Sequence, residues 1–418
     1  MKPSARIQTS IELLDKIYQG RVPMDTTCGD YFRVRRYIGS KDRADIVERV
    51  YDMMRKHARL GYILEHHHVP DTPRARVIAH LLMEGNPQRI RDSFDGAKYA
   101  PEPLDVLEEK FVNEFKTPKF PEAVEAECPP EFEERLRDIF QDKFAVEMSA
   151  MLRPATLDLR VNLAKSTKEK AQNFLEADGV KTNETPYSPW GLRCQNKAYL
   201  SRTKAFSKGW VEIQDEGSQL IAYAAGAQPG MQVLDYCAGA GGKTLALAAA
   251  MQNKGRIVAM DLDTRRLMKS RERLKKAGVA DIVEVRPLEE EKNKKWLRRQ
   301  KGTFDLVLLD VPCSGTGTWR RNPDMRWRTY GPEIQELTEI QAEILGKVTH
   351  TVKPGGRLVY ATCSLLKEEN EAQINRFLDQ NQDFKLEPIN SSFADEMMRL
   401  TPHQHETDGF FAAVMVRQ

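Results

Sequence analysis

From about residue 230 onward, short continuous apolar runs alternate with longer amphipathic segments, and this alternation constrains the fold more than any other feature of the chain. The apolar runs end in VLDYC, IVAMD, IVEVR, LVLLD and LVYATC. Strands buried on both faces have this continuous apolar character, and the segments between them match helices that cover those faces. The pattern predicts a doubly wound, mostly parallel sheet, whose ligands bind beyond the carboxyl ends of its strands.

A glycine-rich stretch, VLDYCAGAGGKTLALA at 233–248, contains the first of these strand ends. A phosphate-binding P-loop needs a glycine where this chain has Cys237, and a dinucleotide fingerprint needs a third glycine where it has Thr244. Asp261 ends the next strand, about twenty residues further on, and is placed to accept hydrogen bonds from ribose hydroxyls. We therefore expect the loop to bind an adenosyl compound without a phosphate chain, and S-adenosylmethionine fits that description.

Two later strand ends carry cysteines: Cys313 follows LVLLD closely, and Cys363 follows LVYAT directly. Because strands that are neighbours in sequence usually lie side by side, we expect the two thiols beside each other and beside the adenosyl pocket. A thiolate that adds to carbon 6 of a pyrimidine makes carbon 5 nucleophilic enough to take a methyl group. A carboxylic acid able to hydrogen-bond N3 would polarise the ring, and Asp310 is expected to face the ligand. Lys243 and nearby backbone amides would favour the thiolate.

The other cysteines and the adjacent histidines are not expected to form a catalytic or metal site. The six cysteines are widely spaced and form no C-x-x-C pair, which argues against a disulfide framework or a zinc site and for the reducing cytoplasm. Cys237 is expected to pack as a small hydrophobic side chain. The adjacent histidines at 66–68 point in different directions on a helix, so we expect a solvated turn and no metal site. The sequence contains no apolar run long enough to predict a membrane span.

The part of the chain before the sheet changes pattern twice. Residues 1–145 repeat apolar side chains at helical spacing, which predicts an all-α domain. Residues 146–208 contain an alternating strand, a helix that Thr167 is placed to cap, and another short strand, which predicts a small α+β module. The sheet domain is expected to span 209–418.

Three basic segments are candidates for contact with a nucleic acid. WRRNPDMRWR at 319–328 interleaves four arginines with two tryptophans, which suit phosphates and unpaired bases, so we expect it to contact RNA. The lysine-rich run KNKKWLRRQK at 292–301 is interpreted as a solvated helix face. FRVRRYIGSKDR at 32–43 fits an RNA-facing surface and a helix end with a turn equally well.

Several motifs of the C-terminal part, taken together, resemble those of the RNA cytosine-5 methyltransferases of the Sun/RsmB type. They are CAGAGGK (237–243), DVPCSGTG (310–317), RRNPDMRW (320–327), YATCSLLKEEN (360–370) and TDGFFAAVMVR (407–417), and the resemblance covers roughly residues 150–418. In that family the nucleophile is the cysteine of the T-C-S loop, matched by Cys363, and the cysteine of the P-C-S loop, matched by Cys313, assists product release. The resemblance assigns the cofactor contacts to Cys237, Ala238, Gly239, Ala240, Gly241, Gly242, Lys243, Asp261 and Asp310.

Two positions depart from the family pattern. Ala240 stands where the family loop commonly has a proline, and Leu288 stands where an aspartate usually contacts the adenine amine. Either Glu289 or the backbone would have to replace that second contact. The departure at Leu288 keeps open the alternative of a non-catalytic assembly factor that binds ribosomal RNA.

The resemblance also implies an architecture and an activity. It implies a Rossmann-like methyltransferase domain, preceded by a NusB-like helical RNA-binding domain and a small ferredoxin-like RNA-binding module. The expected protein is a monomeric, cytoplasmic enzyme that uses S-adenosylmethionine to methylate carbon 5 of a cytosine in 16S ribosomal RNA, as in the bacterial branch of the family. Transfer RNA is the alternative substrate. Methylation of an exocyclic amine is disfavoured, because that chemistry needs no thiol.

Overall fold

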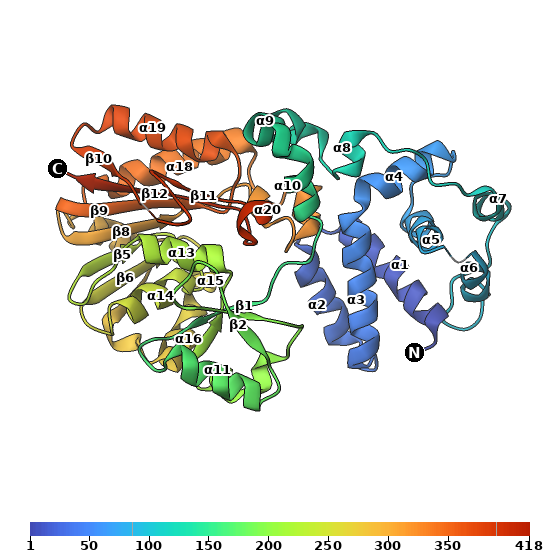
Figure 1. Cartoon of the computed structure of the whole chain (residues 1–418), viewed down its shortest axis with the longest axis horizontal. Coiled ribbons are helices and arrows are strands. Elements are labelled where there is room, and N and C mark those ends of the chain that lie inside the picture. Colours follow the sequence, from blue (N-terminus) through green and yellow to red (C-terminus); the bar gives the residue numbers. More distant parts are fainter. Residues whose placement is uncertain (86, 390) are drawn as a thin grey trace. The chain divides into compact units, whose positions relative to one another are not determined.

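The computed structural model describes residues 1–85, 87–389 and 391–418. Its chain forms two compact units (Figure 1). The first unit holds Met1–Arg153 together with Trp319–Gly331, and the second holds Pro154–Thr318 together with Pro332–Gln418. The segment 319–331 therefore belongs to the first unit, although the chain before and after it belongs to the second.

A large mixed sheet forms the centre of the second unit. Its strands are β5 (Gln232–Asp235), β6 (Arg256–Asp261), β7 (Val283–Pro287), β8 (Phe304–Asp310), β9 (Val352–Thr362), β10 (Phe384–Glu387), β11 (Met398–Leu400) and β12 (Phe410–Arg417). They follow the order β10-β12-β9-β8-β5-β6-β7, with β11 also paired to β12. Strands β5 to β9 run parallel, while β12 is antiparallel to β9, β10 and β11. The predicted doubly wound, mostly parallel sheet is confirmed.

Helices cover both faces of this sheet (Figure 1). Consecutive strand residues point to opposite faces, so Val233 and Leu234 of β5 enter different cores. One core packs the sheet against α13 (Glu216–Ala224), α14 (Gly242–Ala250) and α16 (Ser270–Ala277). The other packs it against α17 (Glu291–Arg298), α18 (Ile334–Thr349) and α19 (Glu371–Gln380). Short helices α15 (Thr264–Met268) and α20 (Pro402–His405) lie in connections. Burial on both faces explains the continuous apolar runs in the sequence.

A small antiparallel sheet precedes the large one in the same unit. It consists of β1 (Asp158–Val161), β2 (Thr182–Glu184), β3 (Gly191–Cys194) and β4 (Val211–Ile213), with helices α11 (Lys168–Ala177) and α12 (Lys204–Ser207). The strand order β2-β3-β1-β4 and the βαββαβ succession are those of a ferredoxin-like module, which confirms that part of the fold prediction. Thr167 caps α11 as predicted, accepting the Lys170 N–H at 3.2 Å. Strand β4 lies inside the predicted range 209–418 and pairs here with β1.

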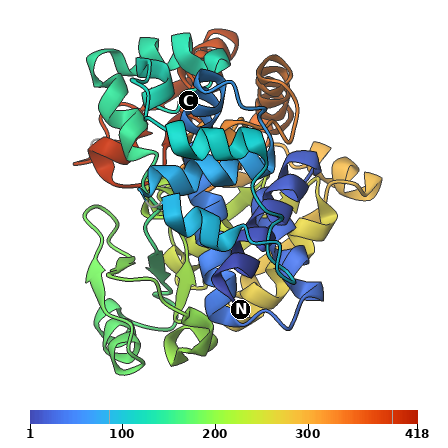
Figure 2. The same cartoon turned by 90° about the vertical axis from the view of Figure 1, so that its right-hand side faces the viewer.

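The first unit confirms the predicted helical N-terminal region. Its helices are α1 (Pro3–Gln19), α2 (Met24–Val34), α3 (Ser40–Arg55), α4 (His57–His66), α5 (Pro73–Met83), α6 (Pro87–Ser93), α7 (Val106–Glu114), α8 (Glu122–Glu125), α9 (Pro130–Phe140) and α10 (Phe144–Ala150). Figure 2 shows them, in blue to teal, packed side by side. Leu14, Val50 and Ile78 are among the fully buried side chains of the core that α1 to α7 share. Across the described ranges, no helix is both long and apolar enough to cross a membrane.

The segment 319–331 completes the helical unit, and its two tryptophans pack against other side chains of that unit. Trp319 is 1% exposed, and its ring meets that of Phe132 edge-on with centroids 5.3 Å apart. The ring of Trp327 stacks on His57 at 4.6 Å. The guanidinium of Arg326 is buried and lies 4.9 Å from the Trp319 ring. Burial of Trp319 contradicts an RNA contact of that ring, whereas Trp327 is only partly buried, and the RNA contact of the segment stays a prediction.

The other two basic segments have simpler outcomes. The lysine-rich run 292–301 falls mainly on α17, where Lys292, Lys294 and Lys295 are exposed, so the solvated helix face is confirmed. In 32–43 the helix α2 ends at Val34 and a turn follows, with Tyr37 78% exposed. The helix end and turn are therefore present, and they leave one aromatic side chain at the surface.

Candidate active site

The glycine loop is pressed against helices α15 and α16. Gly239 and Gly241 have positive φ angles of 54° and 81°, a conformation that favours glycine. A Cβ added at Gly241 would lie 2.8 Å from the Ser270 Cβ, and one added at Gly239 would lie 3.1 Å from the Arg266 guanidinium. A Cβ added at Gly242 would meet only Gln214, at 4.0 Å. The loop is thus closed on its helix side and has open space at Gly242, where α14 begins.

Asp235, at the end of β5, lies buried next to this loop. Its Oδ2 accepts the Thr244 hydroxyl at 2.6 Å, whereas its Oδ1 has no hydrogen-bond partner among the described residues. Burial raises the pKa of Asp235 to about 7. A buried acceptor without a partner is costly, so this oxygen suits a donor group brought by a ligand.

Asp261 and Asp310 lie at two further strand ends. Asp261 is the last residue of β6, and its Oδ2 accepts the Gly239 N–H at 2.7 Å, which ties the loop to that strand. Asp310 ends β8 and is paired with the Lys243 ammonium at 2.6 Å. Because Asp310 already neutralises Lys243, this lysine is not the unpaired cation that a P-loop offers to phosphates. The loop therefore departs from a phosphate site in its charge as well as in its sequence.

The two cysteine loops meet beyond the ends of β8 and β9. These strands are parallel neighbours, with Asp310 opposite Ala361, so Cys313 and Cys363 leave the sheet side by side. Their Sγ atoms lie 3.4 Å apart, and both cysteines are free and partly exposed. The predicted proximity of the two thiols is confirmed. Two groups in such contact, at the ligand edge of the sheet, can both act on one small planar substrate.

The expected stabilisation of a thiolate applies to the attacking thiol and stays a prediction, whereas the pKa of the Cys313 thiol is shifted upward. The hydrogen bond with Cys363 raises the pKa of the Cys313 thiol well above its usual range, and burial raises it further. Lys243, the cation expected to favour a thiolate, is held by Asp310 instead. Cys313 is accordingly a thiol, able to donate its proton.

Cys237 and Leu288 both pack as apolar side chains. Cys237 is partly buried against the core on the α18 side of the sheet, and burial raises the pKa of its thiol, in line with the expected structural role. Leu288 belongs to the same core, and its N–H donates to the Asp261 carbonyl at 2.8 Å. The Glu289 carboxylate accepts the Thr264 hydroxyl at 2.6 Å. Position 288 therefore offers no side-chain acceptor for the adenine amine, as the sequence indicated.

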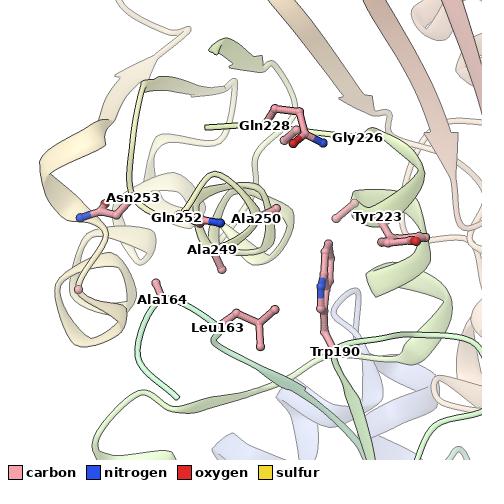
Figure 3. A pocket seen from close by; sticks show the side chains of 13 residues that line it. Leu163, Ala164, Trp190, Tyr223, Gly226, Gln228, Ala249, Ala250, Gln252 and Asn253 are labelled. Atoms are coloured by element: carbon pink, nitrogen blue, oxygen red, sulfur yellow. The ribbon is translucent and has the colours of Figure 1, made fainter. Parts of the chain in front are cut away.

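Figure 3 shows a hollow in another part of this unit. It has a volume of about 550 Å³ and includes Trp190, Tyr223, Ala249 and Gln252 in its lining. Ala249 lies near the end of α14, and this helix starts at the glycine loop and runs back across the sheet. The hollow therefore lies toward the amino ends of the parallel strands, whereas the site lies at their carboxyl ends. The cysteines and acidic residues of the site do not line the hollow.

Sequence reasoning missed a buried polar cluster behind the two thiols. Glu369 is fully buried and accepts the Ser314 N–H at 2.8 Å, and Gln341 is also fully buried and donates to Glu369 at 3.0 Å. Glu369 belongs to the run KEEN, whose charge predicts a surface position. The only signal in the sequence is its place a few residues after Cys363, and that does not show which way the side chain points.

A parallel sheet with a glycine loop after its first strand, acidic side chains at the next strand ends and a thiol pair beside them defines a Rossmann-like methyltransferase domain. Comparison with known proteins agrees. The family model described as 16S rRNA methyltransferase RsmB/F matches residues 222–416.

Individual relatives match most or all of the chain. A ribosomal RNA small subunit methyltransferase B from Salmonella arizonae is 30% identical over 92% of this chain and 93% of its own length. The crystal structure of PH0851 superposes with a TM-score of 0.79 at 28% identity, covering 100% of this chain and 99% of its own. A methyltransferase homolog protein from Pyrococcus horikoshii has a TM-score of 0.61 at 29% identity, covering 71% of this chain and 98% of its own. The chain belongs to the RsmB/F family of 16S rRNA methyltransferases.

Proposed function

We propose that this protein transfers a methyl group from S-adenosylmethionine to carbon 5 of a cytosine in 16S ribosomal RNA, through a covalent adduct with Cys363. The observation that carries the proposal is the 3.4 Å contact between the sulfur atoms of Cys313 and Cys363 at the ligand edge of the sheet. Methyl transfer to an oxygen or to an exocyclic amine needs no thiol, whereas transfer to carbon 5 needs a nucleophile at carbon 6. The family membership supports RNA as the substrate class.

The residues of the glycine loop fit an adenosyl cofactor. The open approach at Gly242, the unpartnered Asp235 Oδ1 and the carboxylate of Asp261 would hold its polar groups, and Lys243 is not free for a phosphate. When bound, S-adenosylmethionine supplies an electrophilic methyl group. The remaining assigned contacts, Cys237, Ala238, Gly239, Ala240, Gly241 and Asp310, belong to the same proposal.

The two thiols have complementary parts in the proposed reaction. The Cys363 thiolate would form a bond to carbon 6, and the electron pair displaced to carbon 5 would make that carbon nucleophilic enough to take a methyl group. A base must then take the carbon-5 proton; the electron pair of that C–H bond re-forms the 5,6 double bond, and the Cys363 sulfur leaves carbon 6 as a thiolate. Cys313 lies in contact with that sulfur and is held as a thiol, so it can donate a hydrogen bond to the departing thiolate.

Asp310 and Lys243 complete the proposed catalytic set. The carboxyl group of Asp310 is about one third exposed, which leaves it accessible to a substrate ring, and its ion pair with Lys243 fixes its direction. From that position Asp310, once it carries a proton, can donate a hydrogen bond to N3 of the base and draw electron density from the ring. We propose that the protein acts as a monomer in the cytoplasm, where reducing conditions keep both thiols free.

Bisulfite sequencing of RNA from cells that lack the protein tests this function. We expect one cytosine of 16S RNA to lose its protection from conversion, and wild-type protein to restore it. Loss of protection in transfer RNA alone would favour the alternative substrate. Unchanged protection in every RNA, with RNA binding retained, would favour a non-catalytic assembly factor instead.

The proposed cofactor contact of Asp261 gives a separate prediction. Asp261→Ala should weaken S-adenosylmethionine binding by on the order of 10- to 100-fold, because a hydrogen bond to a charged acceptor contributes about 1.5–3 kcal/mol. Isothermal titration calorimetry of the folded variant measures this change. Asp263→Ala is the matched control, since it removes a nearby carboxylate whose partner is the Arg266 N–H. Equal affinities in the Asp261 variant and the wild type would contradict the contact, and Cys363→Ala should bind the cofactor normally.

A further inference from the structure

One buried carboxylate joins the loop that carries Cys313 to the loop that carries Cys363. Oε1 of Glu369 accepts the Ser314 N–H at 2.8 Å, and Oε2 accepts the Ser314 hydroxyl at 2.6 Å. The Ser364 hydroxyl also donates to Oε2. Ser314 directly follows Cys313, and Ser364 directly follows Cys363. Glu369 thus holds the residue next to each thiol.

Other buried groups tie the same parts together. Gln341 of α18 donates to Glu369 Oε1 at 3.0 Å and to the Pro312 carbonyl at 2.9 Å. The Thr316 hydroxyl oxygen accepts the Leu365 N–H at 2.8 Å, which adds a direct bond between the two loops. These bonds converge on a site from which water is excluded, because Gln341, Thr316 and Glu369 are all fully buried. In such a place hydrogen bonds are strong, and a donor that loses its acceptor is costly.

We propose that Glu369 is a positioning residue that keeps the sulfur atoms of Cys313 and Cys363 in contact by clamping their two loops to one carboxylate. Without Glu369, Ser314 and Ser364 lose the acceptor they share, and the loops can separate. The use of this contact in catalysis rests on the proposed function. The contact itself does not, so it can be tested without RNA or cofactor.

The charge of Glu369 has a second effect that must be separated from its shape. After the hydrogen bond with Cys363 and burial, the negative charge of Glu369 adds to the influences that raise the pKa of Cys313. Glu369→Gln keeps the shape and an acceptor oxygen but removes the charge. Glu369→Ala removes both. Comparing the two variants distinguishes a clamp from an electrostatic effect.

The rate of disulfide formation between Cys313 and Cys363 measures how closely their sulfurs are held. Diamide takes two electrons and two protons from the two thiols, leaving a disulfide and the hydrazine form of the reagent. We expect Glu369→Ala to form this disulfide slower by on the order of tenfold or more, and Glu369→Gln to match or exceed the wild-type rate. Peptide mapping by mass spectrometry follows the bond. Glu339→Gln and Glu339→Ala, at an exposed position of α18, are the matched controls and should match the wild type.

The direction of the expected change excludes the charge as its cause. Removing a negative charge favours the thiolate and would speed oxidation, so a slower rate in Glu369→Ala must reflect lost proximity. A Glu369→Ala rate within about twofold of the wild type, in a protein whose circular dichroism is unchanged, would overturn the proposal. If that variant does not fold, Ser364→Ala removes one bond of the clamp, and we expect it to slow the disulfide several-fold, about threefold or more. An unchanged rate there would overturn the proposal equally.

The assay also separates this proposal from the proposed function. If disulfide formation is rapid and depends on Glu369 but the protein methylates no RNA, the positioning role of Glu369 is supported and the proposed methyl transfer is contradicted. Conversely, methylation that survives in Glu369→Ala at the wild-type rate would show that the reaction does not need the fixed contact. Methylation that is lost in Glu369→Ala and restored in Glu369→Gln is the result we expect.

Discussion

Cys363→Ala should abolish both methylation and covalent capture of RNA, with turnover falling by at least about 10³-fold, because it removes the proposed nucleophile. Cys313→Ala should retain the attack on carbon 6 and fail at release, because the departing sulfur loses the donor that lies 3.4 Å away. RNA should then accumulate on Cys313→Ala as an adduct that survives denaturing electrophoresis. Incubation with radiolabelled S-adenosylmethionine and substrate RNA measures both outcomes in one gel.

Cys194→Ala provides a control for the loss of a thiol as such. Cys194 is buried in the small sheet, away from the two loops, and its removal should leave turnover unchanged. An adduct on Cys363→Ala and none on Cys313→Ala would exchange the two roles. Full activity in both variants would remove the thiol mechanism altogether.

The alternation of strands and helices, the mostly parallel sheet and the strand ends that carry the site could be predicted from sequence, because each depends on a repeating physical pattern. Burial on two faces leaves apolar runs such as that from Leu306 to Leu309, and the run ends where polar side chains begin. Parallel strands bring those ends to one edge of the sheet. The contact between Cys313 and Cys363 followed from that argument together with the expected pairing of their strands.

The microscopic environment of the site could not be predicted in the same way. The pKa of Cys313 depends on which group meets its sulfur, and Lys243 turned out to be engaged by Asp310. Glu369 lies in a run of charged residues. Two of its donors, Ser314 and Gln341, come from distant parts of the chain, and Ser364 lies five residues before it. Such long-range partners leave no local periodicity in a single sequence.

The segment 319–331 shows the same limit for aromatic and basic residues. Arginines and tryptophans suit RNA, yet they also suit each other, since a guanidinium packs on an indole ring. Asp324 accepts both the Met24 N–H and the Tyr330 hydroxyl at 2.8 Å, so this segment is bonded into the helical unit at several points. A sequence shows what such side chains can bind but not whether the protein itself has already bound them.

Trp319→Ala should therefore lower the free energy of unfolding of the helical unit by about 3–5 kcal/mol. The RNA affinity of the protein should change only through that loss of structure. The ring is 1% exposed between Phe132 and the buried guanidinium of Arg326, so alanine leaves a cavity and removes a cation–π partner. Its Nε1 has no hydrogen-bond partner among the described residues, which lowers the expected cost toward 3 kcal/mol. Hydrogen exchange should then be about 100-fold faster in the core amides of α1, α3 and α5 and unchanged in the large sheet.

Two variants make the result decisive, because they separate packing from recognition. Trp319→Phe keeps a ring in the site and drops only the unpaired N–H and part of the indole, so it should cost much less than alanine. Tyr37→Ala removes an aromatic ring that is 78% exposed, and hydrogen exchange should not respond to it. Wild-type hydrogen exchange in Trp319→Ala together with weakened RNA binding would instead indicate that this tryptophan contacts RNA, as the sequence suggested. The structure favours the opposite outcome, since a ring that fills a core has no free face left for a base.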